Sequence, residues 1–98
     1  MRKHEAIARL KQAEPAIRAL GAASLYLFGS HARDEARSDS DVDVFIDKEP
    51  SRHFGFHEFM AIYLALREAI GVEVGYTTRE GLVDFYRSDI EREAIRVF

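Results

Sequence analysis

Hydrophobic positions in this chain change along its length between helical spacing and short continuous apolar runs. From Ile7 to Leu20 the apolar residues recur at helical spacing, which predicts a helix over residues 2–20. Pro15 lies inside this segment and indicates either a kink or a new first helical turn, because proline lacks the N–H that a helix interior uses. Gly21 follows and is typical of a helix end.

Two later segments have the same spacing. One extends from Phe54 or Phe56 to Ile70, and the other extends from Leu82 to Arg96. A glycine follows the first of them, as it does the N-terminal segment. We therefore expect a second long helix and a C-terminal helix.

Short apolar runs between the helical segments predict the strands. The three runs are Leu25–Phe28, Asp41–Ile46 and Val72–Thr77, and residues 97–98 are expected to add a short terminal strand. Residues 31–37 are few and charged, and we expect one or two helical turns there.

The alternation of helices and strands predicts an α/β (α+β) fold with a small mixed β-sheet and helices packed on one face. The length of 98 residues is that of one domain covering residues 1–98. The other face of the sheet is expected to stay partly open.

Composition narrows the possible functions. A net charge of −3 gives no general electrostatic attraction to nucleic acid. The chain has no cysteine, which excludes a disulfide framework and a thiolate metal site. No apolar run approaches the roughly 18 residues of a membrane span, and no signal peptide is recognisable, so we expect a cytoplasmic protein without membrane association.

Two carboxylates open the second strand. Asp41, Asp43 and Phe45 share one face of it because side chains alternate along a strand, and the Cα atoms of the two aspartates would lie about 6.6 Å apart. Paired carboxylates suit hard cations such as Mg²⁺, and two-metal sites of this kind catalyse phosphoryl transfer. A calcium loop is the rival interpretation of these acids, but Val44 stands where the EF-hand needs glycine.

The first strand ends at Gly29-Ser30, which has the properties of a phosphate-binding turn. Glycine lets a bulky ligand approach the backbone, and Ser30 could cap a following short helix whose free N–H groups attract phosphate. Arg33, one turn further on, could add a cation for the same anion. His31, inside this segment, is expected to be solvated, with a phosphate contact as the alternative.

Gly29-Ser30, ten intervening residues and Asp41-Val42-Asp43 together resemble the signature of the polymerase-beta-like nucleotidyltransferase superfamily. The extended form Gly29-Ser30-His31-Ala32-Arg33 adds to the likeness, and at this length the chain is similar to minimal nucleotidyltransferases, often antitoxin partners of HEPN toxins. The resemblance implies a palm-like fold and transfer of a nucleotidyl group, most often AMP from ATP, to a hydroxyl. It also implies Mg²⁺ or Mn²⁺ on the aspartates, a HEPN-domain toxin whose tyrosine accepts the group, and a possible homo-oligomer.

One position departs from the family pattern. The resemblance implies a third acid on the strand after the second long helix, and alignment through Thr78-Arg79-Glu80 puts Gly75 there. Glu73, two residues earlier and on the same face of a regular strand, is the candidate to replace it as the general base, with an ordinary solvated carboxylate as the alternative.

Two other functions stay open, and the departure at Gly75 favours the first of them. A catalytically weakened module could keep the nucleotide pocket and neutralise its partner by binding alone. An enzyme that modifies small molecules such as aminoglycosides fits less well, since the chain has no room for a second structure to hold that acceptor.

Overall fold

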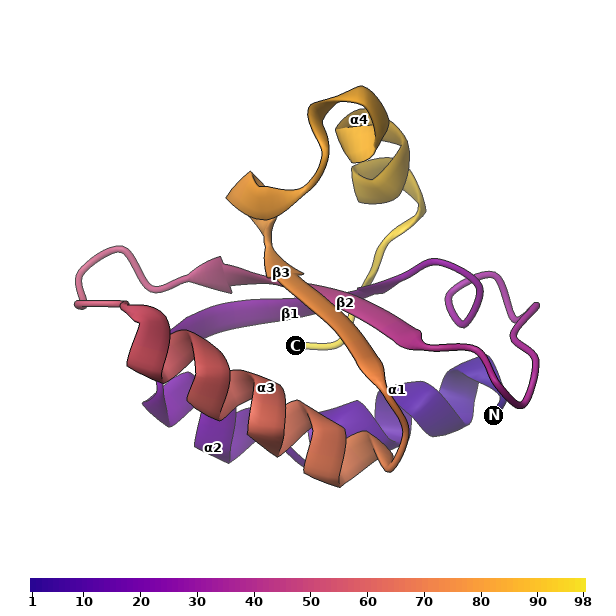
Figure 1. Cartoon of the computed structure of the whole chain (residues 1–98), viewed down its shortest axis with the longest axis horizontal. Coiled ribbons are helices and arrows are strands. Elements are labelled where there is room, and N and C mark those ends of the chain that lie inside the picture. The colour runs from indigo at the N-terminus through magenta and orange to yellow at the C-terminus, as the bar shows by residue number, and fades with distance from the viewer.

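The computed structural model describes all 98 residues of the chain. A small sheet, a layer of three helices and one separate helix make up the fold (Figure 1). The elements in chain order are α1 (Lys3–Lys11), α2 (Glu14–Ala19), β1 (Ala22–Phe28), β2 (Val42–Lys48), α3 (Phe56–Ile70), β3 (Val74–Thr78), a 3₁₀ turn (Arg79–Gly81), α4 (Asp84–Glu93) and β4 (Ile95–Arg96).

The four strands form one mixed sheet in the order β3-β2-β1-β4. β1 is antiparallel to both β2 and β4, whereas β2 and β3 are parallel. The parallel pair needs a crossover connection, which α3 provides. The predicted mixed sheet is confirmed, and its central strands β1 and β2 carry the two halves of the motif.

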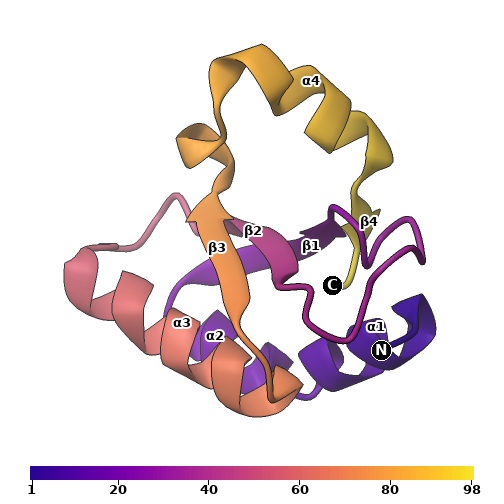
Figure 2. The same ribbon diagram turned by 45° about the vertical axis from the view of Figure 1, so that its right-hand side comes forward.

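One face of the sheet packs on α1, α2 and α3, which lie together beneath it in Figures 1 and 2. Alternate residues of β1 and β2, among them Leu25, Leu27 and Val44, are fully buried there against apolar residues such as Leu10 and Leu66. Because this face holds nearly all of the apolar core, the opposite face is free to carry polar groups.

α4 lies on the opposite side of the sheet from the other three helices, so the expectation that the helices pack on one face is wrong for this helix (Figures 1 and 2). None of its residues is buried, and Phe85 and Tyr86 are 82% and 55% exposed. Beneath it, Tyr26 and Phe45 stack with ring centroids 4.9 Å apart, and Phe45 is fully buried. A small aromatic cluster therefore covers part of the face that the aspartates share.

Several boundaries differ from the predicted ones, and the C-terminal helix expected over residues 82–96 is confined to Asp84–Glu93. The segment 2–20 forms two helices, and Pro15 stands in the first turn of the second, which confirms the alternative of a new first turn; its missing N–H costs nothing there. Residues 31–37 contain no helix: residues 31–34 belong to a hydrogen-bonded turn, in which Asp34 takes a left-handed φ of 57°, and residues 35–37 have no regular structure. The third strand begins at Val74, two residues late, since the chain must first return from the helix layer to the sheet.

The terminal strand is also displaced: β4 is Ile95–Arg96, although Val97 still donates its N–H to Leu25 O at 2.8 Å. No helix of the fold has both the length and the apolar character needed to cross a membrane.

Candidate active site

A tight turn at the end of β1 places Gly29 and Ser30 beside the aspartates. Gly29 has a φ of 75°, a conformation that other residues rarely adopt, and its carbonyl accepts from Arg33 N at 3.2 Å. Ser30 O accepts from Glu35 N at 2.8 Å. Because the segment is a turn, Ser30 caps no helix, and the predicted phosphate cradle consists of turn N–H groups.

Asp43 lies between two glycines of the neighbouring strands. In the sheet register Asp43 pairs with Phe28, the residue before Gly29, and on the other side with Gly75. A Cβ atom added to Gly29 would lie 2.4 Å from Asp43 Oδ2, and one added to Gly75 would lie 2.4 Å from Asp43 Oδ1. The Asp43 carboxylate is therefore in contact with the backbone of the turn, and the two halves of the motif meet in space.

Asp41 is exposed immediately before β2, close enough to Asp43 to affect it. Partial burial raises the pKa of Asp43, and the negative charge of Asp41 raises it further, while His31 and Arg33 act in the opposite direction. A divalent cation between the two carboxylates would relieve this unfavourable charge. Two carboxylates are the type of donor that such an ion prefers. No three His, Asp or Glu side chains form a cluster that could hold a metal, so the remaining ligands would have to come from outside the chain, such as phosphate oxygens or water.

Glu93, the last residue of α4, belongs to the site although the sequence pattern did not single it out. Its Oε1 accepts from Gly29 N at 3.1 Å, and its carboxylate pairs with Arg33 Nη1 at 3.1 Å. Arg33 also donates from Nε to Glu35 at 2.8 Å. Arg33 is therefore held near the turn by carboxylates of the chain itself. Only the fold brings residues 29 and 93 together.

Glu73 is not brought to the aspartates. It precedes β3, and its carboxylate accepts from Tyr63 Oη of α3 and from Val74 N, with Arg67 at 3.9 Å. The hydrogen bond from Tyr63 is the main cause that lowers the pKa of Glu73. The expectation that Glu73 follows strand alternation and reaches the site is wrong for this structure, because the residue lies outside the strand.

His31 is buried, with 2% exposure, and the expectation of a solvated side chain was wrong. It lines a cavity of about 290 Å³ together with Met1, Glu5 and Arg9 of the N-terminal segment. The turn directs it towards α1, and its Nδ1 has no hydrogen-bond partner.

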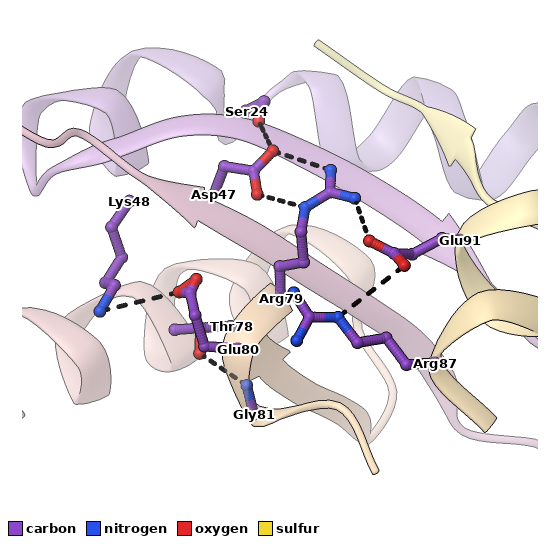
Figure 3. A network of polar contacts seen from close by, with 9 residues as sticks. All are labelled: Ser24, Asp47, Lys48, Thr78, Arg79, Glu80, Gly81, Arg87 and Glu91. Atoms are coloured by element: carbon purple, nitrogen blue, oxygen red, sulfur yellow. Dashed lines mark hydrogen bonds and ion pairs between the residues drawn. The ribbon is translucent and has the colours of Figure 1, made fainter. Parts of the chain in front are cut away.

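Arg79 ties α4 to the same face of the sheet (Figure 3). It donates to both oxygens of Asp47 at 2.6 and 2.9 Å and to Glu91 of α4 at 2.7 Å. Its guanidinium lies 5.0 Å from the Tyr26 ring centre and 4.9 Å from that of Phe45. The hydrogen bonds to Asp47 and Glu91 raise the pKa of Arg79, and the bidentate pairing and cation–π contacts hold its guanidinium between the sheet and α4.

The glycine turn, the two aspartates and Arg33 lie together at one end of the central strands β1 and β2. The model of the nucleotidyltransferase domain matches residues 7–97. The chain belongs to the nucleotidyltransferase domain family. This nucleotidyltransferase-domain protein is 34% identical to a candidate minimal nucleotidyltransferase of known structure. The two folds have a TM-score of 0.80 over 97% of this chain and 95% of that one.

Three further proteins resemble the chain in sequence or in fold. The chain is 29% identical over 75 residues to a Methanocaldococcus jannaschii protein named as a candidate protein adenylyltransferase, covering 76% of this chain and 75% of that protein. A toxin-antitoxin solved with AMP-PNP has the same fold at 13% identity, with a TM-score of 0.69 over 90% of this chain and 72% of that one. The MntA-HpeT toxin-antitoxin is similar at 12% identity, with a TM-score of 0.66 over 100% and 73%.

Proposed function

We propose that this nucleotidyltransferase-domain protein transfers AMP from ATP, in the presence of Mg²⁺ or Mn²⁺, to a hydroxyl of a partner protein. The acceptor that the family resemblance favours is a tyrosine of a HEPN-domain toxin, which the modification would neutralise in the cell. The candidate protein adenylyltransferase from Methanocaldococcus jannaschii supports the choice of a protein acceptor.

The observation that carries the proposal is the contact between Asp43 and Gly29. A metal on Asp41 and Asp43 and a triphosphate on the turn would then be neighbours, because the Asp43 carboxylate already touches the turn backbone. The metal would supply charge neutralisation at the phosphate that is attacked.

Each residue has a role within this proposal. Asp41 and Asp43 hold the metal, and Gly29 and Ser30 bind the β- and γ-phosphates through turn N–H groups and the Ser30 hydroxyl. Arg33 adds a positive charge for the phosphates. Pyrophosphate leaves as the acceptor oxygen bonds to the α-phosphorus, and the proton of the acceptor hydroxyl passes to solvent water. We do not assign the acceptor proton to Glu73, since its carboxylate is bound to Tyr63.

The test is transfer of label from ATP labelled in the α-phosphate to a HEPN-domain protein encoded beside this one. We expect label on that protein with Mg²⁺ or Mn²⁺, and none with Asp43→Asn. Asp89→Asn is the matched control because it removes the same charge from an exposed ion pair with Arg92 on α4. Equal labelling by Asp43→Asn and Asp89→Asn would contradict the proposal.

A second function is favoured by one observation, the absence of an acid beside Asp43 at Gly75. In that case the protein binds nucleotide and inhibits its partner by association alone. Neutralisation of the partner by Asp43→Asn as fully as by the wild-type protein, with no label transferred by either, would support this function and exclude the enzyme.

A further inference from the structure

The carboxylate of Glu93 occupies the donors that a nucleotide phosphate would use. It accepts from the turn N–H of Gly29 at 3.1 Å and from Arg33 Nη1 at 3.1 and 3.3 Å. A carboxylate and a phosphate take the same kinds of donor, a backbone N–H and a guanidinium. Glu93 therefore makes within the chain the contacts that the proposed function requires of a triphosphate.

We infer that Glu93 is an internal competitor of the nucleotide, and that it must leave Gly29 and Arg33 before a triphosphate binds. The inference rests on the proposed function, because it concerns the same turn. Simultaneous binding is disfavoured by the repulsion between the Glu93 carboxylate and phosphate oxygens, and by the loss of shared donors.

The way α4 is attached makes this release easy. No residue of α4 is buried, and beside Glu93 the helix is joined to the 3₁₀ turn by the polar pair of Glu91 with Arg79. The side chain of Glu93 is 32% exposed and borders solvent, so it can rotate away without uncovering the apolar core. Release of Glu93 therefore breaks its charge-assisted hydrogen bonds and little else. Such a contact can be displaced by a bound ligand.

Displacement of Glu93 would also change the partner of Arg33 from a carboxylate to a phosphate. Arg33 bonds to Glu35 and Glu93, and both contacts raise its pKa. When a triphosphate displaces Glu93, the freed guanidinium is already beside the turn and needs no long movement. Glu93 is then both the competitor and the group that keeps Arg33 in place.

The experiment compares the dissociation constant of a non-hydrolysable ATP analogue, with Mg²⁺ at fixed ionic strength, for the wild-type protein and two variants. Glu93→Gln removes the charge, and Glu93→Ala removes the acceptor as well. We expect both to bind the analogue about tenfold more tightly, the effect of losing one charge-assisted competitor. Asp89→Asn, the same charge change in an exposed ion pair on the same helix, should bind as the wild-type protein does.

Equal or weaker binding by both Glu93 variants, with binding by the wild-type protein, would overturn the inference and leave the proposed function standing. Glu93 would then only position Arg33. No binding by any of the four proteins with Mg²⁺ or Mn²⁺ would overturn the proposed function, and the inference with it.

A second readout needs no nucleotide. Amide hydrogen exchange at Gly29 should be faster in both Glu93 variants than in Asp89→Asn, because the acceptor of that N–H is weakened or lost. Unchanged exchange in both would show that the contact is not formed in solution and would overturn the inference.

Discussion

Gly75 and Asp43 face each other on the parallel strands β2 and β3, and the Asp43 carboxylate fills the space that a side chain at residue 75 would need. A Cβ at Gly75 would lie 2.4 Å from Asp43 Oδ1, well inside the closest approach of such atoms. The family resemblance implies a third acid at residue 75, but the space for its side chain is filled by the carboxylate of Asp43.

Replacement of Gly75 by alanine should impair metal-dependent transfer more than it affects folding. The added methyl group meets the end of the Asp43 side chain, while the Asp43 Cα is 4.0 Å away, so the carboxylate must move and the backbone need not. We expect stability to change by about 1 kcal/mol at most, and transfer to fall by tenfold or more, because small misplacements of reacting groups are costly. Urea unfolding and the labelling assay measure the two effects.

Thr77→Ser is the control for this prediction, since Thr77 lies on the same strand two residues further on and pairs with Phe45. An alanine at residue 75 that leaves transfer at the wild-type rate would contradict the proposed place of Asp43. Gly75→Asp should not improve activity, because its larger side chain needs the same space.

The sheet and the two halves of the motif could be predicted from the sequence because both depend on local pattern. Apolar runs predicted β1 and β2, and the second run placed Asp43 on β2, with Asp41 immediately before it. The position of Glu73 could not be predicted, since a two-residue shift in the start of β3 moved it off the strand. Glu93 was missed because its partners are 64 and 60 residues away in the chain.

Asp43→Asn should stabilise the metal-free protein at neutral pH while it abolishes transfer. Because burial and Asp41 raise the pKa of Asp43, the folded chain holds a proton more tightly there than the unfolded chain does. That carboxylate therefore costs stability as the pH rises through its pKa, and the cost persists at pH 7. Because solvent screens the exposed side of this carboxylate, we expect the free energy of unfolding of the variant to be higher by about 0.5 kcal/mol.

Thermal unfolding without metal measures this gain, which should vanish near pH 3, where Asp43 is protonated in both states. Added Mg²⁺ should stabilise the wild-type protein and leave Asp43→Asn unchanged, because only the former binds it. Equal stabilisation of both proteins by Mg²⁺ would show that the ion binds elsewhere.

Arg79→Lys should destabilise the protein at neutral pH, since lysine cannot bond both Asp47 oxygens and Glu91 together. The Arg79 hydrogen bonds are the main cause that lowers the pKa of Asp47, followed by that of Ser24. Because the pKa of Asp47 is lowered by folding, its carboxylate stabilises the folded chain when the pH is above the ordinary pKa of 3.8. This stabilisation is lost as the pH falls from 3.8 through the lowered pKa. For partly exposed groups we expect a loss of about 1 kcal/mol at pH 7 that shrinks towards pH 2, measured by urea unfolding. A deficit that is constant with pH would exclude the Asp47 pair as its source.

Glu73→Gln tests the one carboxylate that sequence and structure place differently. Because Glu73 accepts from Tyr63 Oη and Val74 N outside the site, we expect its replacement to leave the transfer rate within about twofold of wild type. Loss of a general base would instead reduce the rate by about 10²–10⁴. Tyr63→Phe is the matched control, since it removes the same hydrogen bond from the other partner. A large loss of rate in Glu73→Gln but not in Tyr63→Phe would show that Glu73 leaves Tyr63 during the reaction and acts as the base.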